Sequence, residues 1–351
     1  CSSLPVCYVL PDLAYVLHTS AQLEQHTEHR IRSTAAMIFP VMMRGGLDAN
    51  GGAGIAQTLK VRLIHSTIRN LILRGAPPDA LQACLSALPP LAQPAAKPTL
   101  YQTLFARGWN VADSGLPCNQ EELAYTLLTF SHVFLRSLRR LGIGLPRADE
   151  EAYLHAWNVV GHVLGIERGL MADTMEQAAS LFARMQAQGR SQALVPDPRP
   201  ALGAALMQTM AQSIPWPVVQ PIPVLLTRYL CGRETAHDLG LDRRVPLASS
   251  ALFWAMLLLA RGIDTLVRRW RPRFSISRTL TRVLGYHFMS RVLMSQTRPL
   301  QLPDGLLNQL DAVVKGWSED PHAPAWLNQL EDRLTTHGSW NPGVARSRAA
   351  P

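Results

Sequence analysis

Apolar residues recur at three- and four-residue intervals through most of this sequence, and the strict alternation of a β-strand is scarce. Residues three and four apart lie on one face of a helix, so this spacing is typical of amphipathic helices. The chain has 351 residues, of which 47% are hydrophobic, and a chain of that length can bury a sizeable core. The sequence therefore predicts an all-α protein, a multi-helix bundle.

Glycine- and proline-rich segments divide the predicted helices. Helical spacing runs from about residue 10 to 41 and breaks in RGGLDANGGAG, residues 44–54. Asn119 is a plausible N-cap for a later helix, because its side chain can accept a hydrogen bond from the first turn. Further helices are predicted at about 55–73, 121–141, 149–164 and 175–188, with proline-rich loops at 87–98 and 195–200.

The most apolar stretch is VPLASSALFWAMLLLA, residues 245–260, which lies between Arg244 and Arg261. It is shorter than the ~20 residues that a helix needs to cross a bilayer. This length predicts a buried helix or one that lies at a membrane interface, rather than a span.

The formal net charge of +9 comes almost entirely from arginine. No glycine-rich phosphate loop, zinc-spaced Cys/His array or aromatic-basic stripe accompanies it, so we predict no nucleic-acid partner. The densest basic run, LVRRWRPRFSISR at 266–278, is either a solvated helix end or a contact with acidic phospholipid. The five cysteines are odd in number and unpatterned, and predict no disulfide framework.

His65 stands among apolar residues in VRLIHSTIRNLIL, residues 61–73. Ile68 and Ile72 share its helical face, and Arg62 and Arg69 flank it. An apolar wall, an imidazole and two guanidiniums suit an iron porphyrin, with the arginines paired to its propionates. The alternative is a core histidine bonded to a backbone carbonyl, and spacing alone does not separate the two.

Upstream, TEHRIRSTAAMIF places His26, Arg30 and Thr34 at four-residue intervals on one helix. A cation and a hydroxyl presented together could bind and polarise oxygen or an oxyanion in a dry pocket. The alternative is a solvated polar stripe, although Met37 continues this face into apolar material.

Four sequence blocks, in order, resemble the latex clearing proteins, which are bacterial rubber oxygenases related to fungal membrane-bound oxygenases. The blocks are HRIRSTAAMIF, MMRGGLDANGGAGIAQTLKVRLIHSTIR, LPCNQEELAYTLLTFSHVFLRSLRRLGI and EEAYLHAWNVVGHVLGIE. The resemblance covers about residues 8–167. It implies a globin-like core with one non-covalent b-type haem. It also implies dioxygen-dependent cleavage of poly(cis-1,4-isoprene) into oligo-isoprenoids with aldehyde and ketone ends.

Site residues carry over from this resemblance position by position. His65 matches the family's proximal iron ligand, and Arg30 and Thr34 match its distal pair. The family's putative catalytic glutamate is not matched, because Leu13–Leu17 holds no carboxylate and Asp12 and Glu24 are only neighbours. Where some members carry a lysine beside the threonine, this chain has Ser33.

The resemblance also sets the expected organisation. We predict one catalytic domain at residues 1–340, with a haem-binding core at 8–190, C-terminal helices at 201–336 and a flexible tail at 341–351. Family members have a further segment before this region, so a truncated start is favoured over a lipoprotein beginning at Cys1. A secreted or cell-envelope location is expected from the family.

Two other functions stay open. A related oxygenase could cleave the prenyl chain of a smaller lipid-like substrate, and the missing glutamate favours this alternative. A non-catalytic helical protein could bind haem or a membrane surface.

Overall fold

The computed structural model describes residues 2–19, 27–48, 51–74, 115–190, 197–212 and 216–269, with a few isolated positions elsewhere. Every secondary-structure element within these ranges is helical, which confirms the all-α prediction. The predicted loop at 87–98, the tail at 341–351 and His26 lie outside the described residues.

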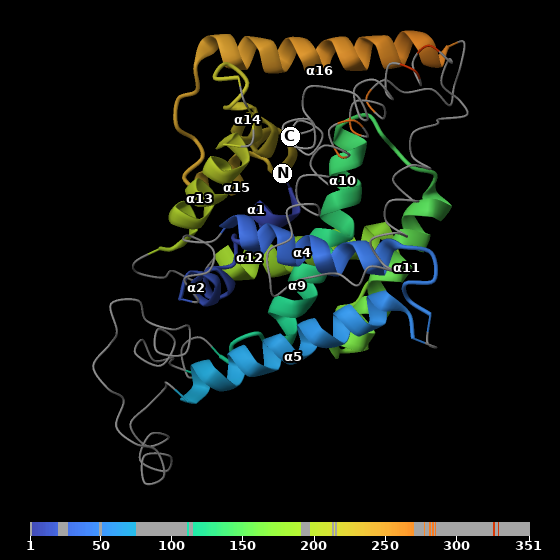
Figure 1. The fold of residues 1–351 in the computed structure, drawn as a ribbon, viewed down its shortest axis with the longest axis vertical. Helices are drawn as coiled ribbons and strands as arrows, with labels where there is room; N and C mark the ends of the chain where they lie inside the picture. Colours follow the sequence, from blue (N-terminus) through green and yellow to red (C-terminus); the bar gives the residue numbers. More distant parts are fainter. Residues whose placement is uncertain are drawn as a thin grey trace, which may run out of the picture.

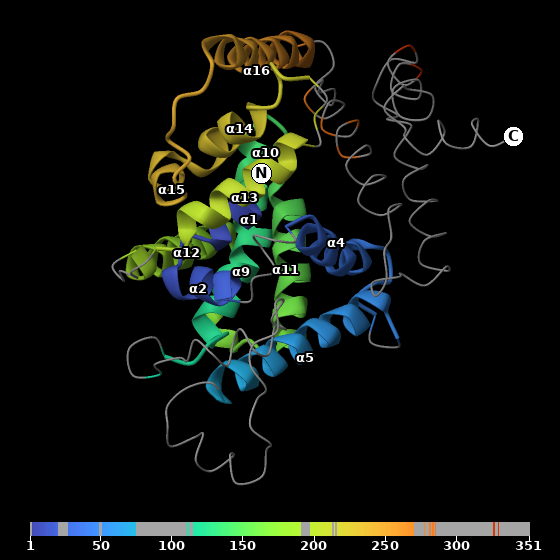
Figure 2. The same ribbon diagram turned by 60° about the vertical axis from the view of Figure 1, so that its left-hand side comes forward.

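The helices form a layered bundle in which α5 lies along one edge and α16 along the opposite edge (Figures 1 and 2). In chain order they are α1 (Ser3–Cys7), α2 (Pro11–Thr19), α4 (Thr27–Met42), α5 (Ala53–Arg74), α9 (Gln120–Phe130), α10 (His132–Arg140), α11 (Arg147–Leu164), the short 3-10 helix η1 (Arg168–Leu170), α12 (Met175–Arg190), α13 (Arg199–Gln212), α14 (Ile222–Cys231), α15 (Arg233–Asp238) and α16 (Leu247–Arg268).

Helix α9 lies at the centre of the main core. Tyr125 and Leu128 of α9 pack in one buried cluster with Trp157 of α11 and Phe182 of α12. The rings of Tyr125 and Phe182 stack with their centroids 5.2 Å apart. The Tyr125 hydroxyl donates a hydrogen bond of 2.9 Å to the carbonyl oxygen of Val6, which attaches the N-terminal helix to this core.

A second buried cluster joins the two ends of the described chain. Ala14 and Leu17 of α2 pack there with Leu202 and Leu206 of α13 and with Leu239. The helices after residue 197 therefore rest directly on the first helices of the chain.

Glycines set the turn between α4 and α5. A Cβ atom added to Gly46 would lie 1.9 Å from the carbonyl oxygen of Pro40, and one added to Gly54 would lie 2.7 Å from the Cα of Val41. The backbone N–H of Ile55 donates to the Gly46 carbonyl at 3.1 Å. Only residues without side chains allow the two backbones this close, so the predicted break at 44–54 is confirmed and becomes a tight helical hairpin.

The helix predicted at 121–141 is wrong in one respect, because it is divided at Ser131. The Ser131 backbone leaves helical geometry, with φ −95° and ψ −82°. Its hydroxyl donates to the Leu127 carbonyl at 2.9 Å, an acceptor that the Ser131 N–H also uses. Such back-bonding by serine bends helices, and here it separates α9 from α10.

The apolar stretch at 245–260 forms a longer helix than predicted. Helix α16 has 22 residues, because it continues through Arg261 to Arg268. By length and composition alone, the portion Leu247–Val267 could cross a membrane. Only 11% of an apolar 18-residue stretch within it is buried. The prediction of a buried helix is therefore wrong, while contact with a membrane interface stays a prediction.

Candidate functional site

Helix α5 lies along one edge of the bundle and packs mainly against α4 and α11 (Figure 1). Ile72 is buried and packs with Val16 of α2 and with Cys118, while Ile68 contacts the same cluster. His65 is half-buried on the same side of the helix. The inward face predicted from spacing is therefore confirmed.

His65 lies between apolar and solvent-facing parts of α5. Its Nδ1 atom is shielded from solvent. The next residues on the outer side, Leu63 and Ile64, are 67% and 53% exposed. His65 thus lies on α5 between the cluster of Ile68 and Ile72 and the exposed apolar side chains of Leu63 and Ile64.

The two arginines that flank His65 hold α5 in place. The Arg62 Nη1 donates to the carbonyl of Val163 at the end of α11, at 3.0 Å. The Arg69 Nε donates to the Pro117 carbonyl at 3.0 Å, and its Nη2 donates to the Cys118 carbonyl. Charge-assisted bonds of this kind are strong, so both guanidiniums have fixed positions on either side of the histidine.

The α4–α5 hairpin places the predicted distal helix beside the helix of His65. Thr34 is half-buried on α4, next to the buried Ala35 and Ala36. Arg30 belongs to α4, but its side chain lies outside the described residues. The catalytic pair of Arg30 and Thr34 thus stays a prediction, placed on an element adjacent to α5.

The region where the family's glutamate is expected is apolar in this chain. Ala14 is fully buried against Leu202 and Leu206 of α13. A carboxylate at that position would be forced into an apolar cluster, which disfavours its charged form. Asp12, two residues earlier, is half-buried, and Glu24 lies outside the described residues.

Glu122 is a buried carboxyl that the sequence analysis did not single out. It forms a capping box with Asn119: the Glu122 N–H donates to the Asn119 Oδ1 at 2.9 Å, and the Asn119 N–H donates to the Glu122 Oε2 at 3.2 Å. Its Oε1 is buried and has no hydrogen-bond partner in the described part of the chain. Burial raises the pKa of Glu122 to about 7, against the bonds from Asn119, and the negative charge of Asp12 adds to the increase.

The capping role of Glu122 could have been found from the sequence, because Asn119 and Glu122 have the spacing of a capping box. Its raised pKa could not. The raised pKa comes chiefly from burial of the carboxyl in the folded core, and the charge of Asp12, more than a hundred residues away in the sequence, adds to it.

The question for this site is whether His65 by itself is enough to hold a metal. The described residues contain no group of three or more His, Cys, Asp or Glu side chains that could hold a metal ion by themselves. A porphyrin supplies the equatorial iron ligands itself and needs only an axial group from the protein. A half-buried imidazole beside an apolar surface, with fixed cations on both sides, fits that requirement.

Comparison with known proteins adds independent findings. A family model described as "ER-bound oxygenase mpaB/B'/Rubber oxygenase, catalytic domain" matches residues 8–262. A rubber oxygenase of Streptomyces sp. (strain K30) is 24% identical over 237 residues, which cover 66% of this chain and 49% of that protein. The chain thus spans about half the length of this curated relative.

A solved structure of a latex clearing protein in the closed state is similar in fold. The TM-score is 0.51 and the sequence identity 17%, with 90% of this chain and 67% of that chain covered. At 17% sequence identity, this similarity is evidence for a shared fold alone.

We expect the Glu122→Gln variant to change how stability depends on pH. The folded protein holds the Glu122 proton more tightly than the unfolded chain, with a pKa of about 7 against 4.5. The wild type therefore loses stability as pH rises from about 4.5 to 7, and glutamine, which keeps the cap but cannot ionise, does not. Urea unfolding should show the variant gaining on wild type at pH 8 relative to pH 4.5, by on the order of 1–3 kcal/mol.

Glu167→Gln is the matched control, because Glu167 is exposed and is not among the charges that act on Glu122. An equal effect of Glu122→Gln at pH 4.5 and pH 8 would contradict the raised pKa.

Proposed function

The chain belongs to the family of ER-bound oxygenases mpaB/B' and rubber oxygenases, and from that membership we propose that it is a haem-dependent dioxygenase that cleaves double bonds of poly(cis-1,4-isoprene). The products would be oligo-isoprenoids with aldehyde and ketone ends. The observation that carries this proposal is the family match over residues 8–262, which includes α4, α5 and all the predicted site residues.

His65 would be the axial ligand of a non-covalent b-type haem. The chain has no Cys-x-x-Cys-His sequence for covalent attachment. When bound, the haem would supply the iron that activates dioxygen. Val61 and Ile68 share the face of His65 and would pack against the macrocycle, and Arg62 and Arg69 are the cations on α5 that would pair with propionates.

Arg30 and Thr34 would contribute from α4. A guanidinium and a hydroxyl one helical turn apart can present hydrogen bonds to one small polar group. The next residues of α4, Ala35 and Ala36, are small and buried, so this part of α4 is shielded from water.

A second candidate is an oxygenase of the same family that cleaves the prenyl chain of a smaller lipid-like molecule. Its support is the apolar burial of Ala14, where a family glutamate is expected. A haem or membrane-surface protein without activity is the third. An absorption spectrum of the purified protein separates both oxygenases from a cofactor-free protein, and product analysis on polyisoprene separates the first candidate from the others.

His65→Ala should lose most of the bound haem, because the described part of α5 offers no second imidazole. The measurement is the haem content per chain, by absorption and by the pyridine haemochrome assay, which also reports the haem type. His155→Ala is the matched control, since His155 is exposed on α11. Wild-type haem content and spectrum in His65→Ala would show that His65 is a packing residue.

Thr34→Ala and Arg30→Ala should keep their haem and cleave polyisoprene more slowly, by about 10²-fold for the loss of one preorganised donor. Thr67→Ala removes the same hydroxyl from an exposed position on α5, where it bonds the Leu63 carbonyl, and should leave turnover unchanged. Unaltered turnover in both α4 variants, or haem loss in both, argues against a catalytic pair.

Asp12→Asn tests which carboxyl replaces the family's glutamate. If Asp12 removes a proton from the allylic carbon, its neutralisation should slow polyisoprene cleavage by on the order of 10²–10⁴-fold with haem content unchanged. Glu122→Gln is measured in parallel, because the two carboxyls influence each other. Full activity in both variants would show that the reaction requires neither Asp12 nor Glu122 as a base.

A further inference from the structure

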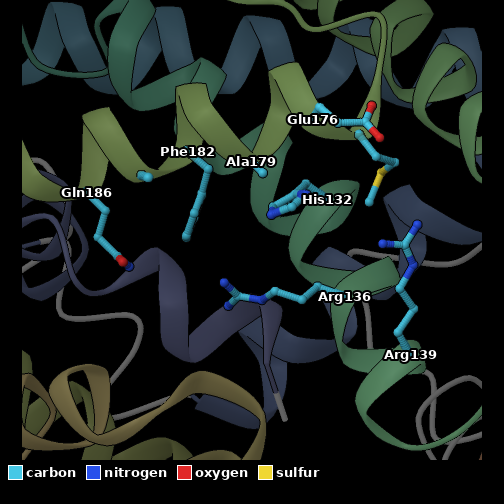
Figure 3. A pocket seen from close by; sticks show the side chains of 9 residues that line it. His132, Arg136, Arg139, Glu176, Ala179, Phe182 and Gln186 are labelled. Carbon is cyan, nitrogen blue, oxygen red and sulfur yellow. The ribbon is translucent and has the colours of Figure 1, made fainter.

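A pocket of about 410 Å³ opens between α10 and α12. Figure 3 shows His132 and Arg136 reaching from α10 toward Phe182 on α12. None of the described residues that line it belongs to α4 or α5, the elements of the candidate oxygenase site. Its volume lies in the range of small-molecule binding sites.

Two of the side chains that line the pocket carry polar atoms whose bonding is incomplete. The Nδ1 of His132 and the Nε of Arg136 are inaccessible to solvent and have no hydrogen-bond partner among the residues that the structure describes. The His132 residue itself is buried, with a relative exposure of 6%. Buried polar groups in folded proteins nearly always have a partner, so an acceptor atom of a ligand would satisfy these groups once the side chains that cover them move aside.

The charges around the pocket favour an anion at its inner end. The Arg139 guanidinium already bonds the buried Glu150, with an Nε–Oε1 distance of 2.6 Å. Among the described residues no carboxylate acts on Arg136, whose guanidinium lies 5.5 Å from the centroid of the Phe182 ring. Burial lowers the pKa of His132 to about 4, and the positive charges of Arg136 and Arg139 add to the decrease. At neutral pH the imidazole is therefore uncharged, and one of its nitrogens carries a hydrogen that can be donated.

The remaining wall is mostly apolar. Met175 and Phe182 are buried, while Ala179 and Ala183 line the exposed side of α12. The pocket contains one carboxylate, Glu176, which is exposed and lies 3.6 Å from Arg147. Small side chains at the mouth leave room for a ligand to enter.

We propose that this pocket binds a small organic carboxylate with a short apolar body. The carboxylate would accept hydrogen bonds from Arg136 and His132, and the apolar body would lie against Phe182 and the alanines of α12. Arg136 is one cation with no carboxylate partner in the described part of the chain and so matches one negative charge, which favours a monoanion over a multiply charged phosphate.

The test uses hexanoate and its neutral counterpart hexanamide, titrated into the full chain by calorimetry or saturation-transfer NMR. We expect hexanoate to bind with a dissociation constant of about 1 mM or lower, as its few heavy atoms allow, and hexanamide at least about tenfold more weakly. Arg136→Gln should weaken hexanoate binding by about ten- to hundredfold, because it removes a charged donor. Arg184→Gln removes an exposed arginine of α12 outside the pocket and should leave binding unchanged.

A blocking variant keeps the test decisive where Arg136→Gln fails to fold. Ala183→Trp introduces a large side chain at an exposed mouth position and should abolish hexanoate binding without changing the circular dichroism spectrum. The proposal is overturned if wild type does not bind hexanoate, if hexanamide binds equally well, or if hexanoate binding survives in a folded Arg136→Gln or Ala183→Trp protein.

Discussion

The close approach of two backbones between α4 and α5 is the constraint on which the candidate site depends. Gly46 and Gly54 leave no space for a Cβ atom, so the end of α4 and the start of α5 are held close together. His65 follows Gly54 by eleven positions, roughly 16 Å at the helical rise. Arg69, bound to the carbonyls of Pro117 and Cys118, fixes α5 again beyond the histidine. The imidazole therefore lies between two anchors, and neither requires a ligand.

Much of this arrangement could be predicted from the sequence because its causes are local. The glycine-rich segment at 44–54 breaks helical spacing, and Asn119 begins α9 as a cap. The inward face of α5 follows from helical periodicity, since residues at three- and four-residue steps share one side. The order of these blocks also indicated the family, which the match over residues 8–262 confirms.

The features that could not be predicted arise from contacts between distant segments. The raised pKa of Glu122 comes first from burial and then from the nearby charge of Asp12 on α2, and spacing along α9 contains no information about either. His132 and Arg136 look like ordinary residues of a basic helix until α12 covers them with Phe182. The length of α16 was underestimated because the apolar run stops at Arg261, whereas the helix continues to Arg268 with Asp264 buried.

The position of α16 means that the molecule does not unfold as one uniform body. This helix rests on α14 along a narrow strip that includes Ser249 and Phe253, whereas Leu258 and Leu266 face water. Helix α9, in contrast, has neighbours on every side. Helices with few buried contacts open locally at a lower free-energy cost than the global transition. Trp254 on α16 is half exposed and Trp157 in the core is buried, so these two of the eight tryptophans would respond to different openings of the molecule, and a single two-state curve would merge them.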